Sequence, residues 1–385
     1  MSRKDVAVLD IGSSKLRVVM AQSTGCKSFN ITGISEIEYS GFNSGEFLDS
    51  EELYSCLNKA ITTCEESAEQ HISKLYVGLP AEFLFCSVKE ASVQFDSRKK
   101  ILKSDVEYLT DKANEFKNNQ DLTLISADAI SFCIDGRKTS EAINQKGQKL
   151  FAKISYQYAK SEMIRLLNEC FSKIGLSSVV YLSSASSQIE LLSQNARTDI
   201  AVMVDCGYIT SHVSVISGDA LTFLGSFSMG GGHIMADLAQ CLEINYSFAE
   251  ILKRKLALSV SPDENEKIEI VKDGEIKTVS YKLANDIACS RIEIISKTIE
   301  KCIELSGEDY PKYFPIFLTG GGISLMKGIK QFLSKTLSQP VEIITYDGPL
   351  LSKPYHTSIV GLVKNALKKE KEYDKSFLAK IFKKW

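Results

Sequence analysis

The sequence predicts a two-lobed α/β fold, and three observations carry this prediction. A buried strand that ends in an aspartate and a glycine-containing turn occurs twice, at Asp10 and at Asp205. A third buried strand, 315–319, ends in a run of three glycines. The chain of 385 residues is also too long for one ordinary hydrophobic core. A repeated unit of this kind indicates an internal duplication, with one copy in each lobe.

The first lobe is expected in two parts, 1–80 and 159–200. The apolar run that ends at Asp10 predicts a buried strand, and the polar turn after it leads into a second strand at 15–20. A helix over 53–67 and a strand over 74–78 complete the first part. In the second part we expect a helix over 161–174, a strand over 178–182 and a helix over 185–194.

A small inserted subdomain is expected over 81–158, because strand-like stretches at 86–95, 122–134 and 149–158 surround one helix that starts near 104. The second lobe is expected over 201–363, with the repeated strand and turn at its start. It also contains an exposed hairpin loop over 261–278 and a long helix over 286–305. A polar linker, 364–374, and a terminal helix, 375–385, are expected after it.

Composition narrows the kind of protein. Eight lysines and three carboxylates lie in 364–385, so this segment carries +5 and the rest of the chain −7 of the net −2. An acidic body argues against nucleic-acid binding, and a basic end favours an anionic surface. The ten cysteines form no Cys-x-x-Cys pair, and no apolar run approaches the ~20 residues of a membrane span. We therefore expect a reduced cytosolic protein without disulfides, whose membrane contact is peripheral.

The terminal segment has the pattern of a basic amphipathic helix. Its apolar residues recur at i, i+1, i+4, i+5 and i+8, which places them on one face, and lysines fill the rest. Such a helix suits an anionic membrane surface. Packing on the protein itself or on a partner chain is the alternative. The expected membrane residues are Phe377, Leu378, Lys380, Ile381, Phe382, Lys383, Lys384 and Trp385.

Both aspartate–glycine turns have the chemistry of a phosphate and metal site. Backbone N–H groups of such a turn can hold phosphate, and a carboxylate at the strand end can hold magnesium through its waters. Ser13, Ser14 and Lys15 add hydroxyls and a positive charge to the first turn. Glycines at 230–232 and 320–322 let backbone approach a ligand closely, although a plain turn before a helix is the alternative. Glu250 and Lys253 share a helix face, as ligand contacts or as a solvated ion pair.

These motifs, in this order and at this separation, resemble the two phosphate motifs and the adenosine motif of the actin, hexokinase and chaperone ATPase fold. Within that superfamily the chain is most similar to the FtsA family of bacterial cell division proteins. The similarity extends over essentially the whole chain. It rests further on Gly231-Gly232-x-Ile234, Ala249-Glu250-x-x-Lys253, Lys103-Ser-Asp105-Val, Ile134-Asp135-Gly136, Arg291-Ile-Glu293 and the basic terminal helix.

The resemblance implies an ATP-binding, filament-forming protein that binds Mg²⁺ with its nucleotide. Its implied partners are FtsZ, further copies of itself, other division proteins and the membrane. It implies a location at the division site, on the cytoplasmic face of the cell membrane. By position, Asp10 and Asp205 are implied around the magnesium and phosphates, and Glu250 and Lys253 at the ribose and base. The phosphate contacts are Gly12, Ser13, Ser14, Lys15, Gly207 and Thr210, and Gly231, Gly232, Gly320, Gly321 and Gly322 flank the nucleoside.

Departures from the family pattern bear on activity. Tyr208 and Ile209 occupy the second turn where small residues are frequent, and His212 stands where many relatives have aspartate. The stretch 181–185 lacks the Glu or Gln with which many members of the fold position the attacking water. Because general-base help of this type is worth ~10²–10⁴-fold, we expect no catalytic residue and at most slow ATP hydrolysis. The alternatives are a small-molecule kinase of the same superfamily, a chaperone ATPase and a type IV pilus assembly ATP-binding protein.

Overall fold

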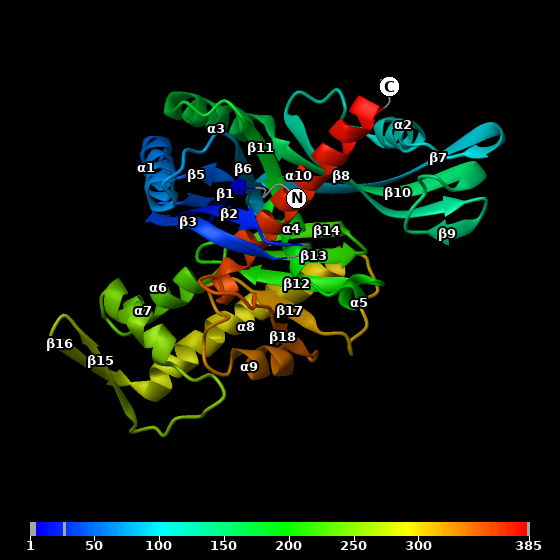
Figure 1. Cartoon of the computed structure of the whole chain (residues 1–385). Helices are drawn as coiled ribbons and strands as arrows, with labels where there is room; N and C mark the ends of the chain where they lie inside the picture. The colour runs from blue at the N-terminus through cyan, green and yellow to red at the C-terminus, as the bar shows by residue number, and fades with distance from the viewer. Residues whose placement is uncertain (1–4, 26–27, 383–385) are drawn as a thin grey trace.

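The computed structural model describes residues 5–25 and 28–382, and for 373–382 it describes the backbone alone. Two lobes face each other across a cleft, and a subdomain extends from the first lobe (Figure 1). The five-stranded sheets of the lobes have the same plan, in which three strands run antiparallel and two more join in parallel. This common plan confirms the two-lobed α/β fold predicted from the repeated turns.

The sheet of the first lobe has the order β11-β6-β1-β2-β3. Its central strands are buried on both faces, because helices cover each side. A short hairpin, β4–β5, lies beside it. The bounds are β1 Asp5–Ile11, β2 Lys15–Ser23, β3 Phe29–Glu38, β4 Phe42–Asn43, β5 Glu46–Phe47, β6 Leu75–Leu79 and β11 Val179–Ser183.

Three helices cover this sheet. α1, Ser50–Ala68, and α3, Ser161–Ile174, pack their apolar faces on one side of it. α10, Thr357–Phe382, packs on the other side, where Ile359, Leu362 and Val363 contact the residues of β1 that face away from α1. The last helix of the chain is thus part of the core of the first lobe.

The second lobe contains the sheet β14-β13-β12-β17-β18. Helices cover one face of it, and the segment 184–192 from the first lobe packs on the other. The strands are β12 Ala201–Cys206, β13 Ser211–Ser217, β14 Ala220–Phe227, β17 Ile316–Thr319 and β18 Val341–Ile343; β15 Lys267–Lys272 and β16 Glu275–Ser280 form the expected hairpin. The helices are α6 Gly231–Cys241, α7 Tyr246–Lys255, α8 Tyr281–Leu305 and α9 Ile329–Thr336, with a 3₁₀ turn, η3, at Pro354–His356.

The inserted subdomain is a four-stranded antiparallel sheet of order β7-β10-β8-β9, with one helix packed on it. It projects away from both lobes (Figure 1). Its elements are β7 Leu84–Lys100, α2 Lys103–Ala113, β8 Leu122–Ile134, β9 Arg137–Thr139 and β10 Lys146–Lys160, after a short 3₁₀ turn, η1, at Ala81–Phe83.

Two segments differ from the sequence-based expectation. The stretch expected as a polar linker, 364–374, is helical and belongs to α10. Its polar composition hid Ala366 and Leu367, which are buried on the first lobe. The helix expected at 185–194 is broken into α4 Ser184–Ser187, a 3₁₀ turn η2 at Gln188–Leu191 and α5 Gln194–Arg197. Serine and asparagine compete with the backbone for hydrogen bonds, which shortens helices here.

Candidate functional site

A cavity of about 840 Å³ lies in the cleft between the lobes. Both aspartate–glycine turns and the glycine run after β17 line it. Of the residues named from the sequence, the cleft is lined by Asp10, Gly12, Ser13, Ser14, Lys15, Asp205, Gly207, Thr210, Glu250, Lys253, Gly320, Gly321 and Gly322. The fold therefore brings together residues from more than 300 positions apart.

The two turns have the same local geometry. The amide of Gly12 donates to the carbonyl of Lys15 at 3.0 Å, and that of Gly207 donates to Thr210 at 3.0 Å. A Cβ on either glycine would lie within 2.9 Å of that carbonyl oxygen, so the tight turn excludes side chains. The turns also touch each other, because the amide of Ile209 donates to the hydroxyl of Ser13 at 3.1 Å. Both turns consequently line one common cleft.

Asp10 closes β1 with a nearly buried carboxylate, 4% exposed. Burial raises its pKa, and the positive charge of Arg17 and the hydroxyl of Ser358 offset this only in part. Ser358, in the first turn of α10, donates to Oδ1 of Asp10 at 2.7 Å. The negative charge of Asp205 raises the pKa of Asp10 further. A pair of carboxylates that disfavour each other's charge is suited to share a cation.

Asp205 closes β12 in the equivalent position and is held on two sides. The side-chain amide of Gln188 donates to its Oδ2, and the backbone of Gly320 approaches its Oδ1 so closely that a Cβ there would lie 2.3 Å away. His212 is its neighbour across the β12–β13 ladder. Burial lowers the pKa of His212, so the imidazole is neutral at pH 7. Gln188 fixes the carboxylate that faces the cleft.

Magnesium fits these donors, although in the described part of the chain no three His, Cys, Asp or Glu side chains gather as a complete metal cage. Mg²⁺ commonly takes one or two protein carboxylates and fills its remaining positions with water and phosphate oxygens. Asp10 and Asp205 supply that number of carboxylates. The carboxylates present are those of a magnesium site completed by a ligand.

Gly231 and Gly232 support the cleft wall from behind and are not among the residues that line it. The amide of Gly231 donates to the carbonyl of Gly207 at 3.0 Å, and the amide of Gly232 donates to Tyr208 at 2.8 Å. Gly322 joins the same cluster, since its amide donates to Cys206 at 2.8 Å. Three chain segments thus meet backbone against backbone at the second turn.

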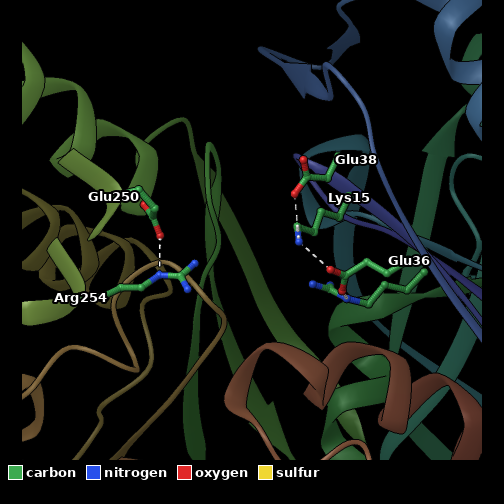
Figure 2. A network of polar contacts seen from close by, with 6 residues as sticks. Lys15, Glu36, Glu38, Glu250 and Arg254 are labelled. Atoms are coloured by element: carbon green, nitrogen blue, oxygen red, sulfur yellow. Dashed lines mark hydrogen bonds and ion pairs between the residues drawn. The ribbon is translucent and has the colours of Figure 1, made fainter. Parts of the chain in front are cut away.

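Glu250 and Lys253 both line the cleft from α7, and Figure 2 shows Glu250 with its neighbour Arg254. The Nζ of Lys253 lies 2.7 Å from Glu250 Oε2 and donates to the carbonyl of Gly231 at 3.3 Å. Arg254 donates from Nε to Glu250 Oε1 at 2.9 Å. Lys253 is buried and Arg254 is exposed. Glu250 and Lys253 therefore form a partly buried ion pair in the cleft wall. This differs from the solvated ion pair that the spacing alone also allowed.

Several cleft residues were missed by the sequence analysis. They are Arg17, Glu36, Glu38, Tyr208, Met326, Lys353, Tyr355 and Ser358, which line the cleft, and Gln188, which holds Asp205. Arg17, Glu36 and Glu38 alternate with apolar residues on β2 and β3, and this alternation is the signal that could have placed them on one face. Nothing in the sequence pairs Ser358 with Asp10.

The terminal segment is helical to Phe382 as the end of α10. Phe377, Leu378, Lys380, Ile381 and Phe382 lie on this helix, whereas Lys383, Lys384 and Trp385 lie outside the described residues. Among the described helices, none combines the length and the apolar character needed to cross a bilayer. The membrane role of these residues remains a prediction from their spacing.

Comparisons with known proteins identify the relationship. A family model described as cell division protein FtsA matches residues 202–361. FtsA of Neisseria meningitidis is 23% identical over 345 residues, which cover 87% of this chain and 82% of the relative. FtsA of Escherichia coli is 23% identical over 402 aligned positions, which cover 98% and 95%.

Solved structures agree on the fold. A PilM–PilN type IV pilus biogenesis complex matches with a TM-score of 0.66 at 16% identity, covering 95% of this chain and 99% of the other. MreB 5 of Spiroplasma citri bound to AMPPNP matches with a TM-score of 0.57 at 12% identity, covering 97% and 99%. At such identities these matches show the fold alone. The chain is thus similar in sequence to the bacterial FtsA cell division proteins, and its fold is the actin-like ATPase fold.

Proposed function

We propose that this protein binds ATP with magnesium in the interlobe cleft and acts as a filament-forming cell division scaffold on the membrane. The observation that carries the nucleotide assignment is the pair of equivalent turns that face one cleft, each preceded by a strand-end aspartate. Two such turns offer opposed sets of backbone donors to a polyphosphate. The relationship to FtsA supports the division role.

Each group of cleft residues has a role in this proposal. Asp10 and Asp205 hold the magnesium ion, which would neutralise phosphate charge when bound. Gly12, Ser13, Ser14, Lys15, Gly207 and Thr210 contact the phosphates. Glu250 and Lys253 bind the ribose and the base edge. Gly320, Gly321 and Gly322 flank the nucleoside, and Gly231 and Gly232 keep that wall in place.

Hydrolysis is proposed to be slow. The residue of the cleft at the end of β11 is Ser184, where a carboxylate or carboxamide would be needed to orient water. Gln188 lies one helical turn further on, but its amide is bonded to Asp205. A carboxamide held in this way is a positioning group for the carboxylate. We expect turnover below about one per second, the low end of ordinary enzymes.

Nucleotide binding is tested by titrating the protein with a fluorescent ATP analogue, with magnesium and with EDTA. We expect saturable binding that weakens when magnesium is removed. Asp205→Asn should abolish the magnesium dependence, while Asp219→Asn, on the β13–β14 turn and outside the cleft, should leave it unchanged. Absence of binding at millimolar ATP would end the nucleotide proposal.

The tail is proposed to lie in the membrane surface. Each lysine near an anionic leaflet contributes ~1 kcal/mol, and each fully buried large apolar side chain ~1.5–3 kcal/mol. A single helix of this kind binds reversibly, so filament formation would strengthen attachment by avidity. Deleting 376–385 should release the protein from anionic vesicles and leave ATP binding intact. Equal sedimentation of both proteins with those vesicles would contradict the anchor.

FtsZ is the proposed partner, and the likeness to the PilM-containing complex provides the competing assignment of a pilus assembly ATP-binding protein. Co-sedimentation with polymerised FtsZ, with and without ATP, separates the two. A division scaffold is carried into the FtsZ pellet. A pilus protein or a small-molecule kinase stays in the supernatant.

A further inference from the structure

Four charged side chains stand in a row along the first-lobe wall of the cleft. Lys15 and Arg17 on β2 lie opposite Glu38 and Glu36 on β3 in the ladder register. Because residues two apart on a strand point to the same face, both cations and both carboxylates face the cleft. Figure 2 shows Lys15 between the two glutamates.

Glu36 is the centre of this row. Its Oε1 lies 2.5 Å from Lys15 Nζ, and its Oε2 accepts from Arg17 Nε at 2.6 Å. Burial alone would raise the pKa of Glu36, but the hydrogen bonds and charges of Lys15 and Arg17 outweigh burial and lower it. The carboxylate is therefore ionised at neutral pH and occupies both cations. Glu38 adds a contact of 3.3 Å to Lys15.

Arg17 also lies close to Asp10 and to Tyr355. On β2 it is the direct neighbour of Asp10 on β1. Its guanidinium lies 5.5 Å from the centre of the Tyr355 ring, and Tyr355 packs where a Cβ on Gly321 would lie. Arg17 donates to Glu36 through Nε, which leaves the forked terminal nitrogens for another planar or tetrahedral anion.

We infer that Arg17 is a second phosphate-binding cation of the cleft and that the Glu36 carboxylate competes with phosphate for both Arg17 and Lys15. This inference rests on the proposed nucleotide binding and specifies which side chains bind the phosphates of the nucleotide. Without a polyphosphate, the Glu36 carboxylate neutralises charge on both cations and so weakens their attraction for phosphate. An isolated phosphate turn would have no such competitor.

The test measures the affinities of ATP, tripolyphosphate and adenosine for the full chain. A hydrogen bond to a charged group is worth ~1.5–3 kcal/mol, so Arg17→Ala should weaken ATP and tripolyphosphate by about 10- to 100-fold and leave adenosine unchanged. Glu36→Gln should strengthen both phosphate ligands several-fold. Arg17→Lys, which keeps the charge without the fork, should fall between wild type and Arg17→Ala.

Arg254→Ala is the matched control. Arg254 also lines the cleft and donates from Nε to a glutamate, but it lies on the other lobe (Figure 2). Arg254→Ala should change tripolyphosphate affinity less than threefold. This control distinguishes the loss of a direct phosphate contact at Arg17 from the loss of one positive charge anywhere in the cleft. The inference would be overturned if Glu36→Gln bound ATP more weakly than wild type. It would also be overturned if Arg17→Ala and Arg254→Ala lost the same amount of tripolyphosphate affinity. Wild-type protein that binds no ATP would instead refute nucleotide binding itself.

If Arg17→Ala does not fold, Glu36→Gln decides alone, because its predicted sign is opposite to that of a merely structural role. If Glu36 only orients the cations, neutralising it should lower the protein's affinity for phosphate ligands. If Glu36 competes with phosphate, neutralising it should raise that affinity. Thermal unfolding of each variant without ligand shows which of them remain folded.

Discussion

Gly322 is a position where one added methyl group should strongly disturb the site. A Cβ there would lie 2.1 Å from the carbonyl oxygen of Gly207, 2.8 Å from that of Cys206 and 2.8 Å from the amide of Gly231. All three contacts are backbone atoms, which cannot rotate away as a side chain can. Gly322→Ala must therefore push apart the segments that meet at the turn after Asp205.

The size of the effect follows from these contacts. Relieving the closest of them requires a backbone shift of roughly 1 Å or more, and overpacking of this kind costs ~1–3 kcal/mol. The hydrogen bond from the Gly322 amide to Cys206, 2.8 Å long, would be lost or stretched at a cost of ~1 kcal/mol. The expected destabilisation is about 2–4 kcal/mol, or about 4–16 °C in the melting temperature of a lobe of this size.

Gly321→Ala, at the neighbouring residue, is the control. Its Cβ would meet only the side chain of Tyr355, at 3.0 Å, and neither glycine has the left-handed backbone that would add strain. We expect a loss below about 1 kcal/mol. Urea unfolding, with ATP titrations on the folded variants, measures both effects. Equal unfolding free energies for the two variants would refute the reasoning from backbone contact.

Three further outcomes are expected. Asp10→Asn should stabilise the ligand-free protein at pH 7 and abolish magnesium-dependent ATP binding, because burial raises the pKa of Asp10 above 3.8. The folded state then binds this proton more tightly than the unfolded state. The ionised carboxylate therefore lowers the free energy of unfolding in full above the raised pKa and not at all well below 3.8. Melting curves of the variant and wild type at pH 4 and pH 7 check this sign. Arg291→Lys should cost ~1–3 kcal/mol in urea unfolding, since it loses the two-pronged contact of 2.6 and 2.8 Å with Asp237; a wild-type midpoint would contradict this. Lys253→Met should weaken the binding of ATP and of adenosine equally. A loss of affinity for ATP alone would instead indicate that Lys253 contacts the phosphates.

The repeated turns could be predicted because their cause is local. A run of apolar residues that ends in Asp-x-Gly needs no partner to be recognised, and its recurrence at Asp205 indicates the second lobe. The glycines of 320–322 and the pair Glu250 and Lys253 were placed beside a nucleotide by their resemblance to short family motifs. Each lies in a short motif whose spacing already contains the geometry.

The remaining parts of the cleft depend on pairings that no local pattern contains. Arg17 meets Glu36 only through the β2–β3 register, and that register includes an irregularity after Met20. Gln188 reaches Asp205 because η2 follows a helix broken after one turn. Gln188 therefore lies outside the stretch 181–185, and its amide holds Asp205.

The C-terminal helix shows how a misjudged segment changes the physical picture of the whole chain. Lysines and glutamates over 364–374 resemble a linker, yet Lys368 pairs with Glu190 at 3.0 Å and Lys74 with Glu370 at 2.6 Å. These contacts hold α10 against the first lobe well past its buried core positions. From Ser358, bonded to Asp10, the helix runs to Phe382 without a break, roughly 36 Å at 1.5 Å per residue. Residues 375–382 thus continue a helix whose first turn is bonded to Asp10, so their direction is set by the lobe that forms half of the cleft.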